Sequence, residues 1–191
     1  MKTFLRPVFV AVSLVAFSIC ALAQSAPEYL PPSEAGPHGS APGMRVKQLS
    51  DSNGQKDYAV IFRPGDEPYA GLTEFAEKYH VQSAHFTAIG GFHDAKLAWF
   101  DLDKKMFRVI PIDQQVEVVS LIGDIALLDG KPQVHMHCVV GLPDGTTRGG
   151  HILDAHVTPL LEVFVTTDPV PLAKKRDPAH GLTLIEPELK P

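Results

Sequence analysis

The chain contains three histidines whose type and spacing suit the binding of a metal ion. His135 and His137 are separated by one residue in an apolar run, and His151 follows a pair of glycines, in the stretch VHMHCVVGLPDGTTRGGH. Neutral imidazole nitrogens bind divalent cations, and three of them supply three corners of the tetrahedron that Zn²⁺ prefers. Imidazole also binds nickel, copper and iron, so zinc is favoured without excluding these metals. Whether the three residues can share one ion depends on the elements that position them.

The segment between the histidines predicts a tight hairpin. Residues 142–146 read LPDGT, in which the proline presets φ at the first turn position and the glycine can adopt the left-handed conformation. When the two ends of this segment pair, His137 lies directly opposite His151, with Cβ atoms about 4.5–5.5 Å apart. Side chains alternate between faces, so His135 lies on the same face, whereas a one-residue change in loop length would move His151 away. We therefore predict a three-histidine metal site; the alternative is an ordinary pair of core or surface histidines on the first strand.

Two other side chains close to the histidines in the sequence need an interpretation. Glu162 lies in the apolar stretch VTPLLEVFV, and a carboxylate in such a strand needs a polar partner. That partner is either the histidine cluster with its metal, or a buried arginine or backbone amide. In the first case Glu162 is the candidate catalytic residue, acting as a proton shuttle. Cys138 is expected to be a small buried hydrophobe rather than a ligand.

The first residues of the chain favour export. Lys2 and Arg6 precede an apolar run, residues 8–19, and the small residues of the sequence ALA follow at the positions that a signal peptidase recognises. The apolar run is shorter than the roughly 20 residues that span a bilayer. We therefore predict a cleaved signal peptide over residues 1–23, and a periplasmic or secreted protein with no stable membrane insertion after cleavage.

The rest of the chain predicts a leader followed by one domain. Residues 24–45 are rich in proline, glycine, alanine and serine, which indicates a flexible leader, and residues 46–187 form the domain. Ten short segments have the composition of strands: residues 45–47, 58–62, 83–89, 96–101, 107–112, 116–122, 125–128, 133–141, 149–157 and 160–166. Turn signals such as Gly90-Gly91 and Asp129-Gly130 separate them. Because the connections are short, neighbouring strands should pair antiparallel.

One segment has the pattern of a helix. Four apolar residues recur at helical spacing: Leu72, Phe75, Ala76 and Tyr79. Asp66 precedes them and is the expected N-cap. One main α-helix packed on a mostly antiparallel sheet corresponds to an α+β fold.

The charge balance argues against nucleic-acid binding. The chain has 17 basic and 22 acidic residues, and loss of residues 1–23 leaves 15 basic residues, for a formal charge of −7. Nucleic-acid binders usually carry a basic patch that displaces counterions from phosphates. The one dense basic cluster, Lys174-Lys175-Arg176, is expected to be part of a solvated tail.

The hairpin region resembles the signature of the PPC domain, the plant and prokaryote conserved domain. The resemblance rests on residues 132–165, with an H-x-H hairpin, a G-G-H return and a following E-V strand, and extends more loosely over residues 46–187. It implies an α+β fold, a homotrimer and, in bacterial members, a metal held by three histidines that correspond to His135, His137 and His151. Family members are often labelled DNA-binding because plant members carry basic R-G-R-P segments, which this sequence lacks.

Two classes of function remain open. In the main prediction, the chain is an exported homotrimeric module that binds a divalent metal, zinc by preference, and the metal is structural or shapes a pocket for a small polar ligand. In the alternative, the open coordination position makes the protein a metal-dependent lyase or hydrolase acting on a small polar substrate, with Glu162 as its proton shuttle. The first is preferred because the sequence shows no second catalytic group of clear assignment.

Overall fold

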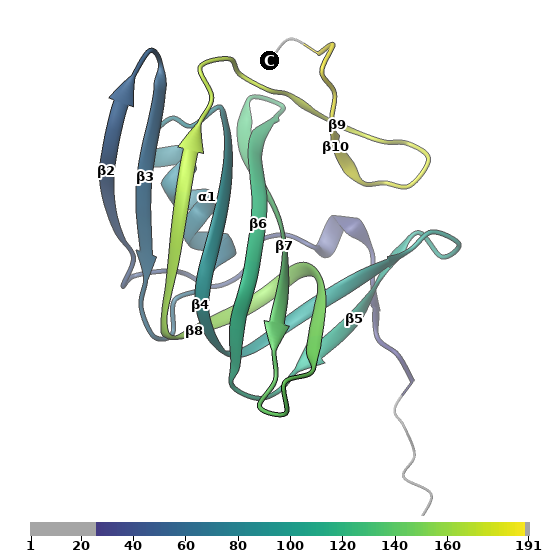
Figure 1. Ribbon diagram of the computed structural model, residues 1–191. Helices are drawn as coiled ribbons and strands as arrows, with labels where there is room; N and C mark the ends of the chain where they lie inside the picture. The colour runs from purple at the N-terminus through teal and green to yellow at the C-terminus, as the bar shows by residue number, and fades with distance from the viewer. Residues whose placement is uncertain (1–25, 190–191) are drawn as a thin grey trace, which may run out of the picture.

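One curved antiparallel sheet and one α-helix make up the body of the molecule (Figure 1). The computed structural model describes residues 26–189, so the predicted signal peptide, residues 1–23, lies outside the described residues. In chain order the elements are β1 (Tyr29–Leu30), the 3₁₀ helix η1 (Pro32–Glu34), β2 (Arg45–Ser52), β3 (Gln55–Phe62), α1 (Pro68–Lys78), β4 (Ser83–Asp101), β5 (Met106–Ile112), β6 (Val116–Leu128), β7 (Lys131–Gly141), β8 (Thr147–Thr167), β9 (Lys174–Arg176) and β10 (Thr183–Ile185). The expected α+β class is confirmed. Within the described part of the chain, no helix has the length and apolar character needed to cross a membrane.

The sheet follows the strand order β1-β5-β4-β6-β7-β8-β3-β2, and β8 pairs in addition with β4. Every pairing in this sheet is antiparallel, as the short connections predict. Strand β8 pairs with β7 through its first residues and with β4 along most of its length, so β4, β6, β7 and β8 close into a ring. Helix α1 contacts β7 and β8 and lies behind the sheet in Figure 1.

Three strands each join two segments that the sequence predicts as separate strands. Strand β4 joins the predicted strands 83–89 and 96–101, and β6 and β8 each join two predicted strands in the same way. Gly90 was expected in a turn, but here β4 bends and continues. A side chain on Gly90 would collide with the carbonyl oxygen of Leu160 on β8. The break predicted at Gly90 was therefore wrong, because glycine in a strand can mark a close approach of two backbones instead of a turn.

The N-cap of helix α1 differs from the prediction by one residue. The Glu67 carboxylate accepts hydrogen bonds from the backbone N–H groups of Tyr69, at 2.9 Å, and Ala70, at 2.6 Å, so Glu67 caps the helix. Asp66, the predicted N-cap, accepts hydrogen bonds from the backbone N–H groups of Gly43 and Arg63, both at 2.8 Å. Asp66 therefore holds the loop before the helix, and an N-cap is not distinguished from a neighbouring acidic residue by composition alone.

The main core lies between α1 and the inner face of the sheet. Leu72, Phe75 and Ala76 of the predicted apolar stripe are fully buried, whereas Tyr79 lies at the C-cap with 37% of its surface exposed. Cys138 on β7 points into this core, as predicted for a small hydrophobe. Burial raises the pKa of its thiol to about 12. Side chains alternate along β7, so Cys138 points to the opposite face from His135 and His137 and does not belong to the histidine site.

The two ends of the described chain meet beside the sheet. Strand β1, within the segment expected to be a flexible leader, pairs with β5, and the tail forms the β9–β10 hairpin. In Figure 1 this hairpin lies above the 3₁₀ helix η1 of the leader. A second small core that includes Phe107 and Leu153 packs against Leu30 of the leader and Leu182 of the tail. The described parts of the leader and of the tail therefore form part of the folded domain.

Candidate metal centre

The histidine hairpin has the predicted register. The N–H of Leu142 donates to the carbonyl oxygen of Thr146 at 2.8 Å, and Gly145 has a φ of 80°, in the left-handed region. These contacts close a three-residue loop with glycine at its last position. As a result His137 on β7 pairs directly with His151 on β8, as the prediction requires.

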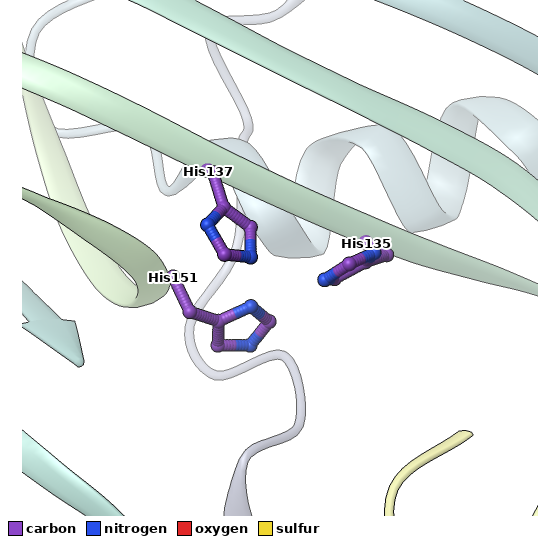
Figure 2. A group of neighbouring side chains, drawn as sticks. All are labelled: His135, His137 and His151. Carbon is purple, nitrogen blue, oxygen red and sulfur yellow. The ribbon is translucent and has the colours of Figure 1, made fainter. Parts of the chain in front are cut away.

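The three imidazoles converge. One nitrogen from each of His135, His137 and His151 lies within 4.8 Å of the others, and Figure 2 shows the three rings facing a common space. Nitrogens at the corners of a tetrahedron about 2.0–2.1 Å from one Zn²⁺ ion lie about 3.4 Å apart, so the rings would rotate toward one another to share one ion. Gly150 allows this arrangement, because a side chain there would collide with the carbonyl oxygen of Ala98 on β4.

The three rings differ in exposure. His151 is 8% exposed and stacks on Phe107, with ring centroids 4.9 Å apart, whereas His135 and His137 are exposed. Burial, followed by repulsion from His135 and His137, lowers the pKa of His151 to about 3. Burial also lowers the pKa of His137. Neutral imidazoles keep the nitrogen lone pairs that a cation binds, so these two rings suit a metal site.

A carboxylate on the neighbouring strand orients one ring. Nδ1 of His135 lies 3.3 Å from Oδ2 of Asp124, the residue that pairs with it across β6 and β7. When Nδ1–H donates to the carboxylate, Nε2 stays free for a metal, as in the carboxylate–histidine–metal arrangement of many proteins. Oδ1 of Asp124 in turn lies 2.7 Å from Nζ of Lys174. Burial favours the neutral form of Asp124, but the hydrogen bonds from His135 and Lys174 outweigh it and lower the pKa of Asp124.

Neither Asp124 nor Lys174 was among the predicted site residues. Asp124 could have been found, because a two-residue turn at Asp129-Gly130 pairs Leu128 with Lys131 and therefore Asp124 with His135. Lys174 could not have been found in this way. It was expected in a solvated tail, but it is 3% exposed.

A cavity of about 500 Å³ lies beside the histidines. All three rings line it, together with residues of η1, β4, β5 and the β9–β10 hairpin. The leader and the tail therefore build one side of the cavity, and the sheet builds the other. A volume of this size accommodates a small organic molecule.

Glu162 lies away from this cavity. It pairs with Ile61 on β3 and Ile89 on β4, it is partly exposed, and it is not among the residues that line the cavity. Within β8 it shares the outer face with Phe164, between the buried residues Leu161 and Val163. The geometry thus brings together the three predicted histidines but not the predicted proton shuttle.

The family comparison agrees with the resemblance of the hairpin. Residues 49–168 match the model of the Plants and Prokaryotes Conserved (PCC) domain, which is more than half of the chain. The chain belongs to this family. No curated protein sequence matches the chain at a significant level.

Solved PCC-type structures share this fold. A plant- and prokaryote-conserved protein of Pyrococcus horikoshii is 29% identical, with a TM-score of 0.65, over 76% of this chain and 96% of its own. A metal-containing protein of Archaeoglobus fulgidus is 26% identical, with a TM-score of 0.64, over 75% of this chain and 97% of its own. A protein of Ralstonia eutropha is 29% identical, with a TM-score of 0.65, over 73% of this chain and 95% of its own. This chain therefore matches nearly the full length of these proteins, and its three converging histidines form a candidate metal site.

Proposed function

We propose that this PCC-domain protein is an exported homotrimeric module in which His135, His137 and His151 of each chain hold one divalent metal ion, preferably zinc. The observation that carries the proposal is the convergence of three ring nitrogens within 4.8 Å, from two paired strands, beside a cavity. The metal-containing relative from Archaeoglobus fulgidus supports it. When bound, the ion would supply a positive, Lewis-acidic centre in the cavity wall.

The surface of the sheet supports self-association. Besides Trp99, five large apolar side chains are at least 40% exposed on the adjacent strands of the ring: Ile89, Val119, Ile122, Val139 and Phe164. Ile122 pairs with His137, so this apolar surface reaches the edge of the metal site. Contiguous exposed apolar surface usually marks an interaction site in a soluble protein. Sedimentation equilibrium of the mature protein should give a trimer, and a monomer at micromolar concentration would refute this part of the proposal.

The role of the metal is proposed to be ligand binding rather than catalysis. A lyase or hydrolase acting on a small polar substrate remains the second candidate, favoured by the cavity beside the histidines. That function also needs a positioned proton-transfer group, and Glu162 does not line the cavity. Nucleic acid is not an expected partner, because the chain is acidic.

Elemental analysis tests the metal proposal. Mature protein that has been reconstituted with Zn²⁺ and freed of excess metal should contain about one zinc per chain. His137→Ala should contain almost none, because loss of one of three ligands leaves a site of two imidazoles. His156→Ala is the matched control and should keep the metal, since His156 bonds Asp94 outside the cluster. Equal zinc in the wild type and His137→Ala would refute the proposal, and circular dichroism would check that each variant folds.

A further inference from the structure

The side chains that line the cavity and carry charge near neutral pH are basic. Lys174 and Arg176 line it together with the three histidines, and among residues 26–189 no aspartate or glutamate lines it. The whole chain carries more acidic than basic residues, 22 against 17. A cavity lined in this way attracts anions in a protein whose overall charge would repel them.

Arg176 is the cation that is free to bind a ligand. Lys174 and Arg176 alternate on one face of β9, toward the cavity, while Lys175 between them does not line it. The ammonium group of Lys174 is already paired with Asp124, at 2.7 Å. For Arg176, in contrast, the described residues 26–189 place no carboxylate within ion-pair distance. Its guanidinium group therefore presents unpaired donors at the cavity.

The remaining cavity wall is mostly apolar. Trp99 on β4, Phe107 on β5 and Leu182, just before β10, line the same space. Trp99 is 58% exposed, an unusual position for the largest apolar side chain. An indole ring in a cavity wall offers a flat apolar surface to a ligand.

We propose that the cavity binds a small organic carboxylate, with its acid group at Arg176 and its apolar body against Trp99, Phe107 and Leu182. A planar guanidinium matches the two oxygens of a carboxylate, and one unpaired cation matches a single negative charge. The assignment rests on the proposed function in one respect, since an ion at the histidines adds positive charge to the same cavity and strengthens the binding. The dependence on Arg176 does not need the ion.

Trp99 makes the assignment measurable, because it is the chain's only tryptophan. Benzoate titrated into the zinc-loaded mature protein should change the tryptophan fluorescence in a saturable way, and saturation-transfer NMR on benzoate gives a second signal independent of Trp99. Arg176→Gln should weaken the binding about tenfold or more, the loss expected for a charged hydrogen bond. Lys175→Gln removes the same charge from the adjacent residue and should bind like the wild type. Benzyl alcohol, the matched neutral probe, should bind much more weakly than benzoate.

The same titration separates this inference from the metal proposal. If the histidines hold no metal, zinc-loaded and chelator-treated protein will bind benzoate equally, but Arg176→Gln will still bind more weakly than Lys175→Gln. The inference is overturned if these two variants bind alike, if benzyl alcohol binds as well as benzoate, or if neither signal detects benzoate. Tighter binding of phenyl phosphate than of benzoate would also overturn the carboxylate assignment.

Discussion

Among residues 26–189, two clusters join an aspartate to more than one histidine, and only one of them has the geometry of a metal site. In the first, Asp124 bonds His135, whose ring faces His137 and His151. In the second, Asp94 lies between His93 and His156.

The hydrogen bonds are shorter in the second cluster. Nδ1 of His93 and of His156 lie 2.7 and 2.8 Å from the Asp94 carboxylate, against 3.3 Å between His135 and Asp124. In the second cluster, Nδ1 of each ring contacts the carboxylate of Asp94, and both histidine side chains are exposed. A short histidine–aspartate contact is therefore no sign of a metal site by itself. Convergence of free ring nitrogens distinguishes the two clusters.

Protonation separates the clusters further. The hydrogen bond to Asp94 raises the pKa of His156, which favours the charged imidazolium. Burial lowers the pKa of His151 to about 3, which keeps that ring neutral. An imidazolium has no lone pair for a metal, whereas a neutral imidazole does. The sheet thus provides opposite environments for the same side chain.

Removing one ring from each cluster should give the largest contrast. We expect His151→Ala to weaken zinc binding by about 100-fold or more, because it removes the most buried of three ligands. His156→Ala should leave zinc affinity unchanged. Competition with a zinc chelator of known affinity measures both, and similar affinities for the two variants would mean that the distinction between the clusters is wrong.

Neutralising the carboxylate of each cluster should give a smaller contrast. Asp124→Asn weakens the group that orients His135, and loss of such a partner typically costs 10–100-fold in metal affinity. Asp94→Asn should have no effect on zinc, since its histidines are not ligands. The same chelator competition applies, and a full zinc affinity in Asp124→Asn would show that the His135 ring needs no carboxylate to hold its orientation.

The smallest expected effect concerns pH and stability. The folded-state pKa of His156 is raised above its ordinary value of 6.5, so its bond to Asp94 stabilises the fold below that pH and loses this contribution as pH rises through the folded-state pKa. His156→Gln should therefore lower the free energy of unfolding at about pH 5.5 but hardly at about pH 8.5. The pair is largely exposed, so we expect a difference of less than about 1 kcal/mol. Urea denaturation of metal-free protein at both pH values measures it, and a larger loss at the higher pH would contradict the assignment.

Much of the histidine site could be predicted because it depends on local turn chemistry. The LPDGT segment fixes a three-residue loop, the loop fixes the register of β7 and β8, and the register brings His137 opposite His151. The position of Asp124 opposite His135 follows in the same way from the turn between β6 and β7. The strands themselves were mostly recognisable from their composition.

The features that could not be predicted depend on contacts between distant parts of the chain. Gly90 is typical of a turn, and only the close pairing of β4 with β8 explains why the strand continues there. Lys174 has the composition of a solvated tail, and its burial depends on the partner that it finds in Asp124. Glu162 follows the alternation of β8 onto the outer face, but its distance from the histidines depends on how the long strands bend.

X-ray absorption at the zinc edge of the reconstituted mature protein tests the central claim most directly. Three imidazoles on one ion predict three nitrogen neighbours at about 2.0–2.1 Å, with the outer-shell scattering of histidine rings. A first shell that contains sulfur, or that contains fewer than three imidazoles, would contradict the account.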